Sequence, residues 1–327
     1  MNFGRKKKKL KFRLSDLASY FIVLAGIFAL LHYFENFFKP LVVSLIIWYI
    51  IRELSRQLSR ISIRGWRFPY WLRSILSFLI ITAFGYSSIQ IVIVNIESLL
   101  DNIPVYTQNI NILIVEVESF LKISLSERLK FENLDLRNMA GAAASGLTAF
   151  LSSSTLIVLY VIFLMAEERV MDRKFKELST LSSNKTKFFD IFGRINRAIH
   201  GYITVKFFTS FTTAIVSNGL LVLLQIDLAG LWAFIIFIMN FIPNIGSILA
   251  TLFPAVFALL QYTSFANFFI VGFAIGSVQL LVGNLLEPRI MGNRLNLSPF
   301  IILFSLFFWG YIWGIIGMVL SVPFTVS

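Results

Sequence analysis

An apolar run with a break at its centre is the feature that most constrains how this chain can fold. Residues 241–261 read FIPNIGSILATLFPAVFALLQ, so Pro243, Asn244 and Gly246 interrupt a segment that otherwise resembles a membrane span. An unpaired backbone N–H or C=O group is costly inside a bilayer, so a helix broken at that depth must line a cavity or pack against protein. Secondary transporters place substrates and coupling ions at such breaks.

The composition indicates an integral membrane protein and argues against an enzyme. The chain is 57% hydrophobic, only 14% charged, and contains 35 Phe. It has no Cys and two widely separated His, which leaves no thiolate nucleophile and no zinc–thiolate site. It also lacks a Gly-rich loop that ends in Lys-Ser or Lys-Thr, so we expect no ATP hydrolysis. We therefore expect no enzymatic activity, no cofactor and no bound metal.

Hydropathy predicts an all-α, polytopic membrane helix bundle with about eight spans. The predicted spans are 17–34, 37–51, 72–94, 147–166, 203–225, a broken pair at 228–260, 265–286 and 300–325. The segment 37–51 is short and starts with Lys39 and Pro40, so it either crosses the membrane tilted or forms a hairpin with the first span.

The chain divides into four parts on this basis. The second part is an insertion that is rich in acidic residues, and the fourth part contains the broken pair at 228–260. The parts are 1–94 with a basic arm and three spans, 95–146 as an extracytoplasmic insertion, 147–202 with the fourth span and interfacial helices, and 203–327 as a transport core.

Loop charge predicts the orientation. The N-terminal arm holds seven Lys and Arg residues, the 52–73 loop holds six Arg, and 167–206 holds nine Lys and Arg. The 95–146 segment instead holds four basic and seven acidic residues. The positive-inside rule then places the N-terminus in the cytoplasm. The net charge of +12 thus reflects membrane topology rather than nucleic-acid binding, and the Lys cluster at 6–9 either contacts anionic lipid or only fixes orientation.

Two polar segments carry amphipathic patterns. In the insertion, apolar residues recur with helical spacing from Ile110 to Leu121, including Leu113 and Val117. This face either packs on its own subunit, lies on the membrane, or contacts another subunit. The segment 184–202 predicts an interfacial helix on the inner leaflet, with His200 near its end as either a proton-carrying group or an unspecialised residue.

The break at 243–246 predicts a binding site. Pro243 removes a backbone donor, Asn244 brings an amide that donates and accepts, and Gly246 allows backbone shapes that other residues avoid. Asn240 lies one turn earlier, and Pro254 is expected to break the returning arm. The segment is either a tight turn between two spans or a re-entrant hairpin, and its apolar surroundings favour the hairpin.

Two further polar features lie nearby in the sequence. Asn284 and Glu287 are one helical turn apart and would share a face, where Glu287 binds a cation, carries a proton, or pairs with Arg289 or Arg294. A stripe of polar residues on 203–225 serves helix packing or lines a polar path. The stripe consists of Lys206, Ser210, Thr213 and Ser217.

The order of these residues in the C-terminal third resembles a known family. The matching positions are Ile242, Pro243, Gly246, Pro254, Ala255, Asn284, Pro288, Gly292, Leu297, Pro299, Gly314, Gly317, Val322 and Pro323. They are similar to those of the AI-2E family of bacterial permeases, and the N-terminal half agrees in layout. The resemblance implies about eight spans, an inner-membrane location, homo-oligomers, and either export of autoinducer-2 or sodium/proton antiport. Family chains commonly continue past Pro323 into a polar tail.

We therefore expect a secondary transporter for a small polar solute or for Na⁺ and H⁺. The predicted site residues, shared between the break and the Glu287 turn, are Asn240, Pro243, Asn244, Gly246, Pro254, Asn284, Glu287 and Pro288. A passive channel lined by the same residues and a non-transporting membrane scaffold are the alternatives.

Overall fold

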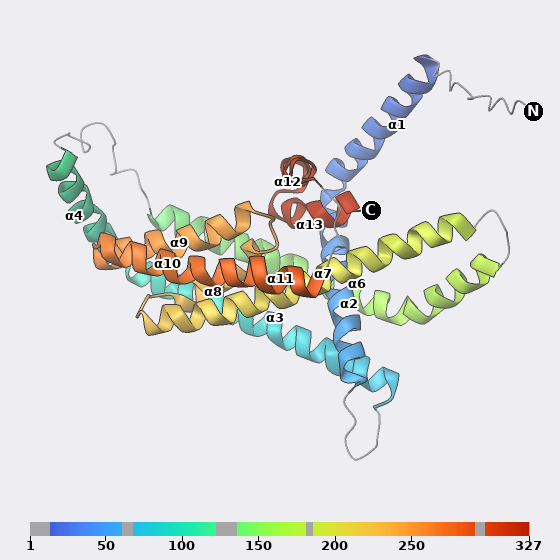
Figure 1. The fold of residues 1–327 in the computed structure, drawn as a ribbon, viewed down its shortest axis with the longest axis horizontal. Helices are drawn as coiled ribbons and strands as arrows, with labels where there is room; N and C mark the ends of the chain where they lie inside the picture. The colour runs from blue at the N-terminus through green and yellow to red at the C-terminus, as the bar shows by residue number, and fades with distance from the viewer. Residues whose placement is uncertain (1–13, 61–67, 122–135, 181–185, 292–297, 327) are drawn as a thin grey trace, which may run out of the picture.

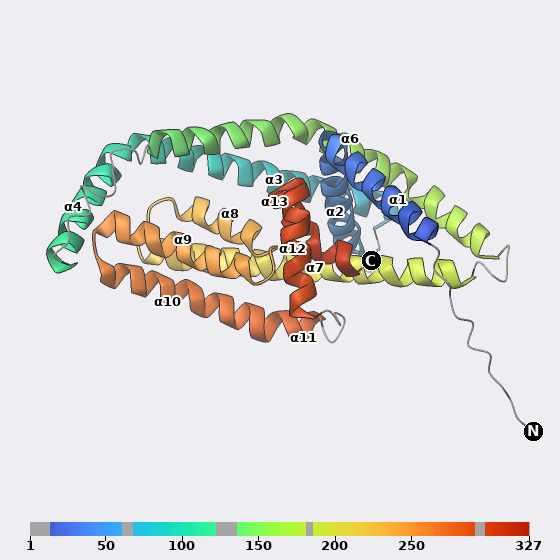
Figure 2. The same ribbon diagram turned by 90° about the horizontal axis from the view of Figure 1, so that it is seen from above.

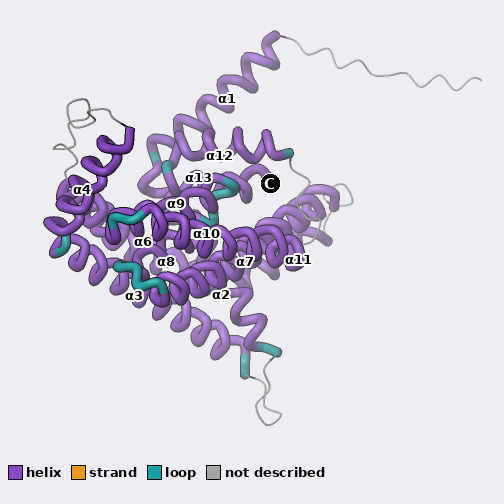
Figure 3. Tube along the Cα trace, turned by 60° about the vertical axis from the view of Figure 1, so that its left-hand side comes forward, coloured by secondary structure: helices purple, strands orange, loops and turns teal. Residues whose placement is uncertain are grey.

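Helices account for every regular element that the structure describes, which confirms the expected all-α class. The structure is a computed structural model, and it describes residues 14–60, 68–121, 136–180, 186–291 and 298–326. Figure 3 shows helix throughout these ranges, with short loops between helices. The elements are α1 (Leu14–Tyr33), α2 (Glu35–Leu58), α3 (Tyr70–Asp101), α4 (Ile103–Leu121), α6 (Leu136–Thr180), α7 (Thr186–Leu223), α8 (Ala229–Met239), α9 (Ile245–Tyr262), α10 (Phe265–Leu281), the π-helix η2 (Val282–Leu286), α11 (Glu287–Met291), α12 (Pro299–Trp313) and α13 (Ile315–Val326).

The helices form an elongated bundle. Figure 2 shows α3 and α6 along one side and α7 to α10 along the other, while α12 and α13 cross them. Among the described residues, five helices are long and apolar enough to cross a membrane, and the bent pair of α1 and α2 would make six. The apolar helices α8, α12 and α13 are shorter. A total of about eight spans remains a prediction.

The first two helices do not form the hairpin that was one alternative for 37–51. The axes of α1 and α2 differ by 85°, and α1 projects from the bundle (Figure 1). Lys39, at the start of α2, forms an ion pair of 2.7 Å with Glu35 one turn earlier.

The expected interfacial helix at 184–202 is not a separate element. From Thr186 onward it is continuous with the predicted span 203–225 and forms the 38-residue helix α7, and residues 184 and 185 lie outside the described residues. No Pro occurs between Thr186 and Leu223, so nothing in this part of the sequence removes a helical hydrogen bond.

The expectation of one span over 300–325 is wrong, because this segment folds back on itself. The chain turns at Gly314, whose φ of +64° favours glycine. A Cβ on Gly317 would lie 1.9 Å from the carbonyl oxygen of Trp309, so only glycine allows the two arms to approach this closely. The rings of Trp309 and Phe324 are 4.4 Å apart, which shows that α12 and α13 pack as an antiparallel pair.

The main core lies where α7, α8, α9 and α10 pack together. Leu221, Ile236 and Ile275 have no exposed surface, and the small residues Ala250 and Ala258 are also fully buried. Small residues allow membrane helices to approach closely. In this core, the broken hairpin formed by α8 and α9 packs closely against α7 and α10.

Helix α4 packs on its own subunit, as one reading of its amphipathic pattern predicted. Tyr106 and Leu113 are 3% and 8% exposed. The Tyr106 hydroxyl donates to Asp227 at 3.2 Å, and Asn109 donates to the Leu260 carbonyl at 2.9 Å. Burial, together with the neighbouring Asp227 carboxylate, raises the pKa of Tyr106 above its ordinary value. The side chains of Phe120 and Leu121 lie outside the described residues.

Candidate functional site

The break in the hairpin is a strained turn. Helix α8 ends at Met239, and α9 begins at Ile245. Asn244 has φ 59° and ψ −59°, and the Ile245 N–H donates to the Pro243 carbonyl at 2.6 Å. These values describe the rare, strained positive-φ form of the γ-turn, and backbone strain of this kind clusters at functional sites.

Gly246 makes this turn possible. A Cβ at this position would lie 1.8 Å from the Met239 carbonyl oxygen, so any larger residue would push α8 and α9 apart. The Gly246 N–H also donates to the Ile242 carbonyl at 3.2 Å. Gly246 was predicted as a site residue, and the structure buries it beneath the turn, where it shapes the break.

A cavity of about 250 Å³ opens between the break, α7 and the end of α10. The π-helix η2 forms part of its wall, and π-helical turns occur frequently at functional sites. The lining residues come from three segments far apart in the sequence: Lys206, Thr209, Thr213, Asn240, Ile242, Pro243, Asn244, Ser247, Gln279, Leu280, Val282, Gly283, Asn284 and Glu287.

The structure brings five of the eight predicted site residues to this cavity. These are Asn240, Pro243, Asn244, Asn284 and Glu287. Gly246, Pro254 and Pro288 do not line it.

Pro254 and Pro288 lie elsewhere for different reasons. Pro254 is fully buried inside α9, which continues past it to Tyr262, so the expectation that this proline breaks the arm is wrong. The surrounding core packs α9 on both sides of Pro254 and keeps the helix continuous. Pro288 is exposed on α11.

Lys206 and Glu287 form an ion pair inside the cavity. The Lys206 Nζ lies 2.9 Å and 3.0 Å from the two carboxylate oxygens of Glu287. The two side chains are 13% and 21% exposed. The alternative pairing of Glu287 with Arg289 does not occur, because residues two apart on a helix do not face each other. Arg294 lies outside the described residues.

Two buried amide atoms beside the ion pair have no hydrogen-bond partner in the described structure. They are the Asn240 Oδ1, which accepts, and the Gln279 Nε2, which donates. Buried polar groups are normally satisfied, and these two atoms leave one acceptor and one donor unpaired in residues that line the cavity.

Sequence reasoning missed Gln279. Its signal was present, because Gln279 is the one amide side chain within the apolar sequence FFIVGFAIGSVQLLV of residues 268–282.

Comparison with known proteins agrees with this architecture. The family model described as AI-2E family transporter matches residues 20–327. The chain belongs to the AI-2E transporter family. The match confirms the resemblance seen in the C-terminal third and extends it over nearly the whole chain. The chain is therefore a multi-pass membrane transport protein.

Relatives of this family member carry transport names. A Haemophilus influenzae protein, provisionally named a transport protein, is 30% identical over 323 residues, which cover 96% of this chain and 90% of that protein. The AI-2 transport protein TqsA of Escherichia coli is 35% identical over 179 residues, 54% of this chain and 50% of TqsA. A sodium-lithium/proton antiporter of Halobacillus andaensis is 23% identical over 227 residues, 69% of this chain and 62% of that protein.

Proposed function

We propose that this AI-2E family member is a secondary transporter that binds a small polar solute in the cavity at the broken hairpin. The observation that carries the proposal is the Lys206–Glu287 ion pair, which lies in the same cavity as the unpaired amides of Asn240 and Gln279. A site that binds one solute tightly on one side of the membrane and releases it on the other needs such groups on elements that can separate.

The chemistry of the wall favours a hydroxylated solute without net charge. The charges of Lys206 and Glu287 balance, and the other polar lining groups are amides and hydroxyls that both donate and accept. A volume of about 250 Å³ suits a small molecule. The relative named as an AI-2 transport protein makes autoinducer-2 the first solute to test.

Cation–proton exchange is the second candidate. The Lys206 ammonium occupies both oxygens of Glu287, as a monovalent metal cation would. Transport of Na⁺ would require the ion to displace the ammonium, and protonation of Glu287 would release it. The relative named as a sodium-lithium/proton antiporter supports testing this reaction.

Flux in proteoliposomes tests the proposal. The purified chain is reconstituted with imposed Na⁺ or H⁺ gradients, and uptake of autoinducer-2 and of each ion is followed. We expect saturable flux driven by a gradient, and its loss in the variants Glu287→Gln and Asn240→Ala.

Lys39→Gln is the matched control, because Lys39 forms an ion pair with Glu35 and neither residue lines the cavity, so the variant should transport like the wild type. Wild-type flux in well-inserted Glu287→Gln and Asn240→Ala proteins would refute the site. Ohmic single-channel currents would instead indicate a channel, and no flux of any tested solute would favour a scaffold.

We further propose that the protein is a homo-oligomer in the bacterial inner membrane with a cytoplasmic N-terminus. The basic and acidic segments of the sequence support this orientation. Because the chain has no Cys, single cysteines introduced at residues 8 and 116 can be labelled from either side without background. Labelling of residue 116 from the outside only is the expected result.

A further inference from the structure

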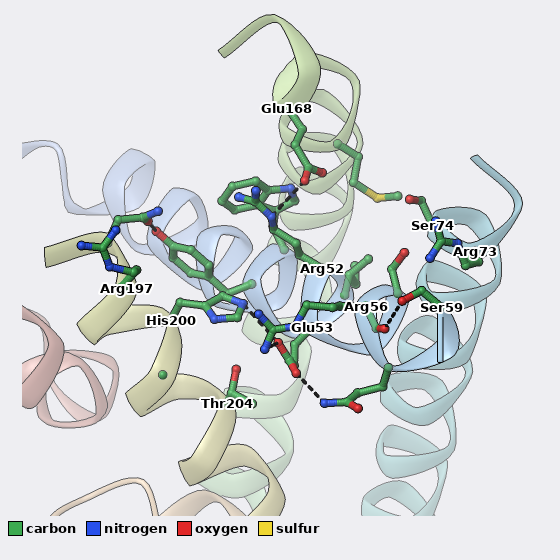
Figure 4. A pocket seen from close by; sticks show the side chains of 18 of the residues that line it. Arg52, Glu53, Arg56, Ser59, Arg73, Ser74, Glu168, Arg197, His200 and Thr204 are labelled. Carbon is green, nitrogen blue, oxygen red and sulfur yellow. Dashed lines mark hydrogen bonds and ion pairs between the residues drawn. The ribbon is translucent and has the colours of Figure 1, made fainter. Parts of the chain in front are cut away.

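A second, larger cavity lies where α2 meets α3, α6 and α7. Its volume is about 1120 Å³, and it shares no lining residue with the cavity at the break. Four arginines and two glutamates line it, as Figure 4 shows. They are Arg52, Arg56, Arg73, Arg197, Glu53 and Glu168.

Both glutamates are already held by cations or donors within the cavity. Glu168 accepts from the Arg52 Nε at 3.0 Å. Glu53, only 3% exposed, lies 2.7 Å from a terminal guanidinium nitrogen of Arg56 and accepts from Gln57 at 2.7 Å. The Glu53 Oε2 atom is buried without a hydrogen bond of its own, but it faces the Arg56 guanidinium and lies 3.8 Å from the His200 Nε2, so both carboxylates already have neighbouring cations or donors.

Two arginines remain without a carboxylate. In the part of the chain that the structure describes, no acidic oxygen lies within 4.0 Å of Arg73 or Arg197. Figure 4 shows Arg73 on α3 and Arg197 on α7, on opposite sides of Arg52 and Glu53. The excess positive charge is thus spread across the cavity.

Unpaired donors line the same cavity. The Arg73 Nε, the Trp48 Nε1 and the Thr204 Oγ1 are buried without a hydrogen-bond partner in the described residues. The first two atoms can only donate, so only an acceptor can satisfy them. Excess arginines and unsatisfied donors together indicate a ligand with negatively charged oxygens.

We propose that this cavity binds phosphate-bearing anions, with Arg73 as a cationic ligand at one side and Arg197 as a cationic ligand at the other. The planar guanidinium group matches phosphate oxygens with paired hydrogen bonds. The volume exceeds the range of about 300–1,000 Å³ that is typical of small-molecule sites, so a phosphate ester fits as well as the bare ion. The ligand is either the headgroup of an anionic lipid or a soluble phosphate ester, because both present the same oxygens.

Binding at this site does not depend on the proposed transport reaction, so a test of ligand binding leaves that proposal untouched. The full chain is reconstituted in phosphatidylcholine nanodiscs, and its thermal unfolding midpoint is measured. In one arm, phosphatidylglycerol replaces part of the phosphatidylcholine. In the other arm, inorganic phosphate or glycerol 3-phosphate is titrated into nanodiscs of phosphatidylcholine alone.

We expect one arm to raise the midpoint, and the responding arm identifies the source of the phosphate. Arg73→Gln and Arg197→Gln should each weaken the apparent affinity about ten-fold, because hydrogen bonds to charged groups are among the stronger ones. Arg173→Gln is the matched control, since Arg173 is exposed on α6 outside the cavity and its loss should leave affinity unchanged.

Two results would overturn the proposal. One is a wild-type midpoint that neither arm raises. The other is an affinity in Arg73→Gln and Arg197→Gln that equals that of Arg173→Gln, which would assign any effect to general surface charge. Arg197 is exposed, so its substitution leaves the packing intact and keeps the test valid if Arg73→Gln fails to fold.

Discussion

The Lys206 ammonium contacts both carboxylate oxygens of Glu287, although the two residues lie 81 positions apart. The contact joins α7 to the start of α11 across the cavity that the broken hairpin completes. It is the single ion pair in that cavity among the described residues, and it therefore dominates the local electrostatics.

A double-mutant cycle at this pair should separate stability from transport. Lys206→Met or Glu287→Leu alone leaves one charge in a mostly buried position, and each should lower the free energy of unfolding by about 3 kcal/mol. The combined variant removes both charges, so we expect its stability to return to within about 1 kcal/mol of the wild type while transport stays abolished. Detergent unfolding curves and proteoliposome flux provide the two measurements, and additive losses in the double variant would argue against a coupled pair.

The strained turn at Asn244 predicts opposite effects for two small substitutions. Asn244→Gly keeps the turn and relieves the positive φ, so it should raise the unfolding free energy by about 1 kcal/mol. Alanine tolerates a positive φ less well than asparagine does. Asn244→Ala should therefore lower the unfolding free energy by about 1 kcal/mol. Thermal unfolding of both variants checks the signs, and equal midpoints would contradict the γ-turn.

Transport by Asn244→Gly then tests the amide itself. Because this variant preserves the backbone, lost flux would assign the Asn244 side chain to solute binding. Normal flux would restrict Asn244 to shaping the hairpin.

Gly246→Ala should disrupt the hairpin. The added methyl group would overlap the Met239 carbonyl oxygen, and we expect a loss of about 3 kcal/mol or more in unfolding free energy, with loss of flux. Gly272→Ala is the control, because its new Cβ would meet only the Ala255 Cβ at an ordinary 3.6 Å. A helical Gly→Ala change of this kind should raise stability by up to about 1 kcal/mol. Similar midpoints for the two variants would contradict the close approach at Gly246.

The raised pKa of Tyr106 predicts a specific sensitivity to alkaline pH. The phenol ionises more readily in the unfolded chain, where its pKa is about 10, than in the folded protein. Its contribution to stability is therefore complete below pH 10 and is lost as the pH rises above that value. Tyr106→Phe should lower stability by about 1 kcal/mol at neutral pH and should flatten the alkaline decline. Unfolding midpoints between pH 8 and 11 provide the measurement, with Tyr86→Phe at an exposed position as control.

The candidate site was partly visible in the sequence. Asn240, Pro243 and Asn244 are close together along the chain, so their grouping followed from local pattern alone. Asn284 and Glu287 share a helical face, which spacing also predicts. Sequence spacing could not predict the ion-pair partner of Glu287, because Lys206 contacts Glu287 only through the packing of α7 against α10 and α11.

The helical hairpin formed by α12 and α13 is a second feature that the sequence pattern did not predict. The apolar sequence of 299–326 is long enough for one span. Hydropathy alone does not show where a helix folds back. The turn depends on Gly314 and on the close contact at Gly317, and a glycine in an apolar helix is equally consistent with simple close packing.

The sequence by itself determined the helical class, the membrane character and the position of the break, because hydropathy and proline chemistry act over a few neighbouring residues. Only the tertiary structure decided which polar groups meet: Lys206 with Glu287 in one cavity, and unpaired arginines in another. Such contacts join residues far apart in the chain, and their geometry is set by the packing of whole helices rather than by any local preference.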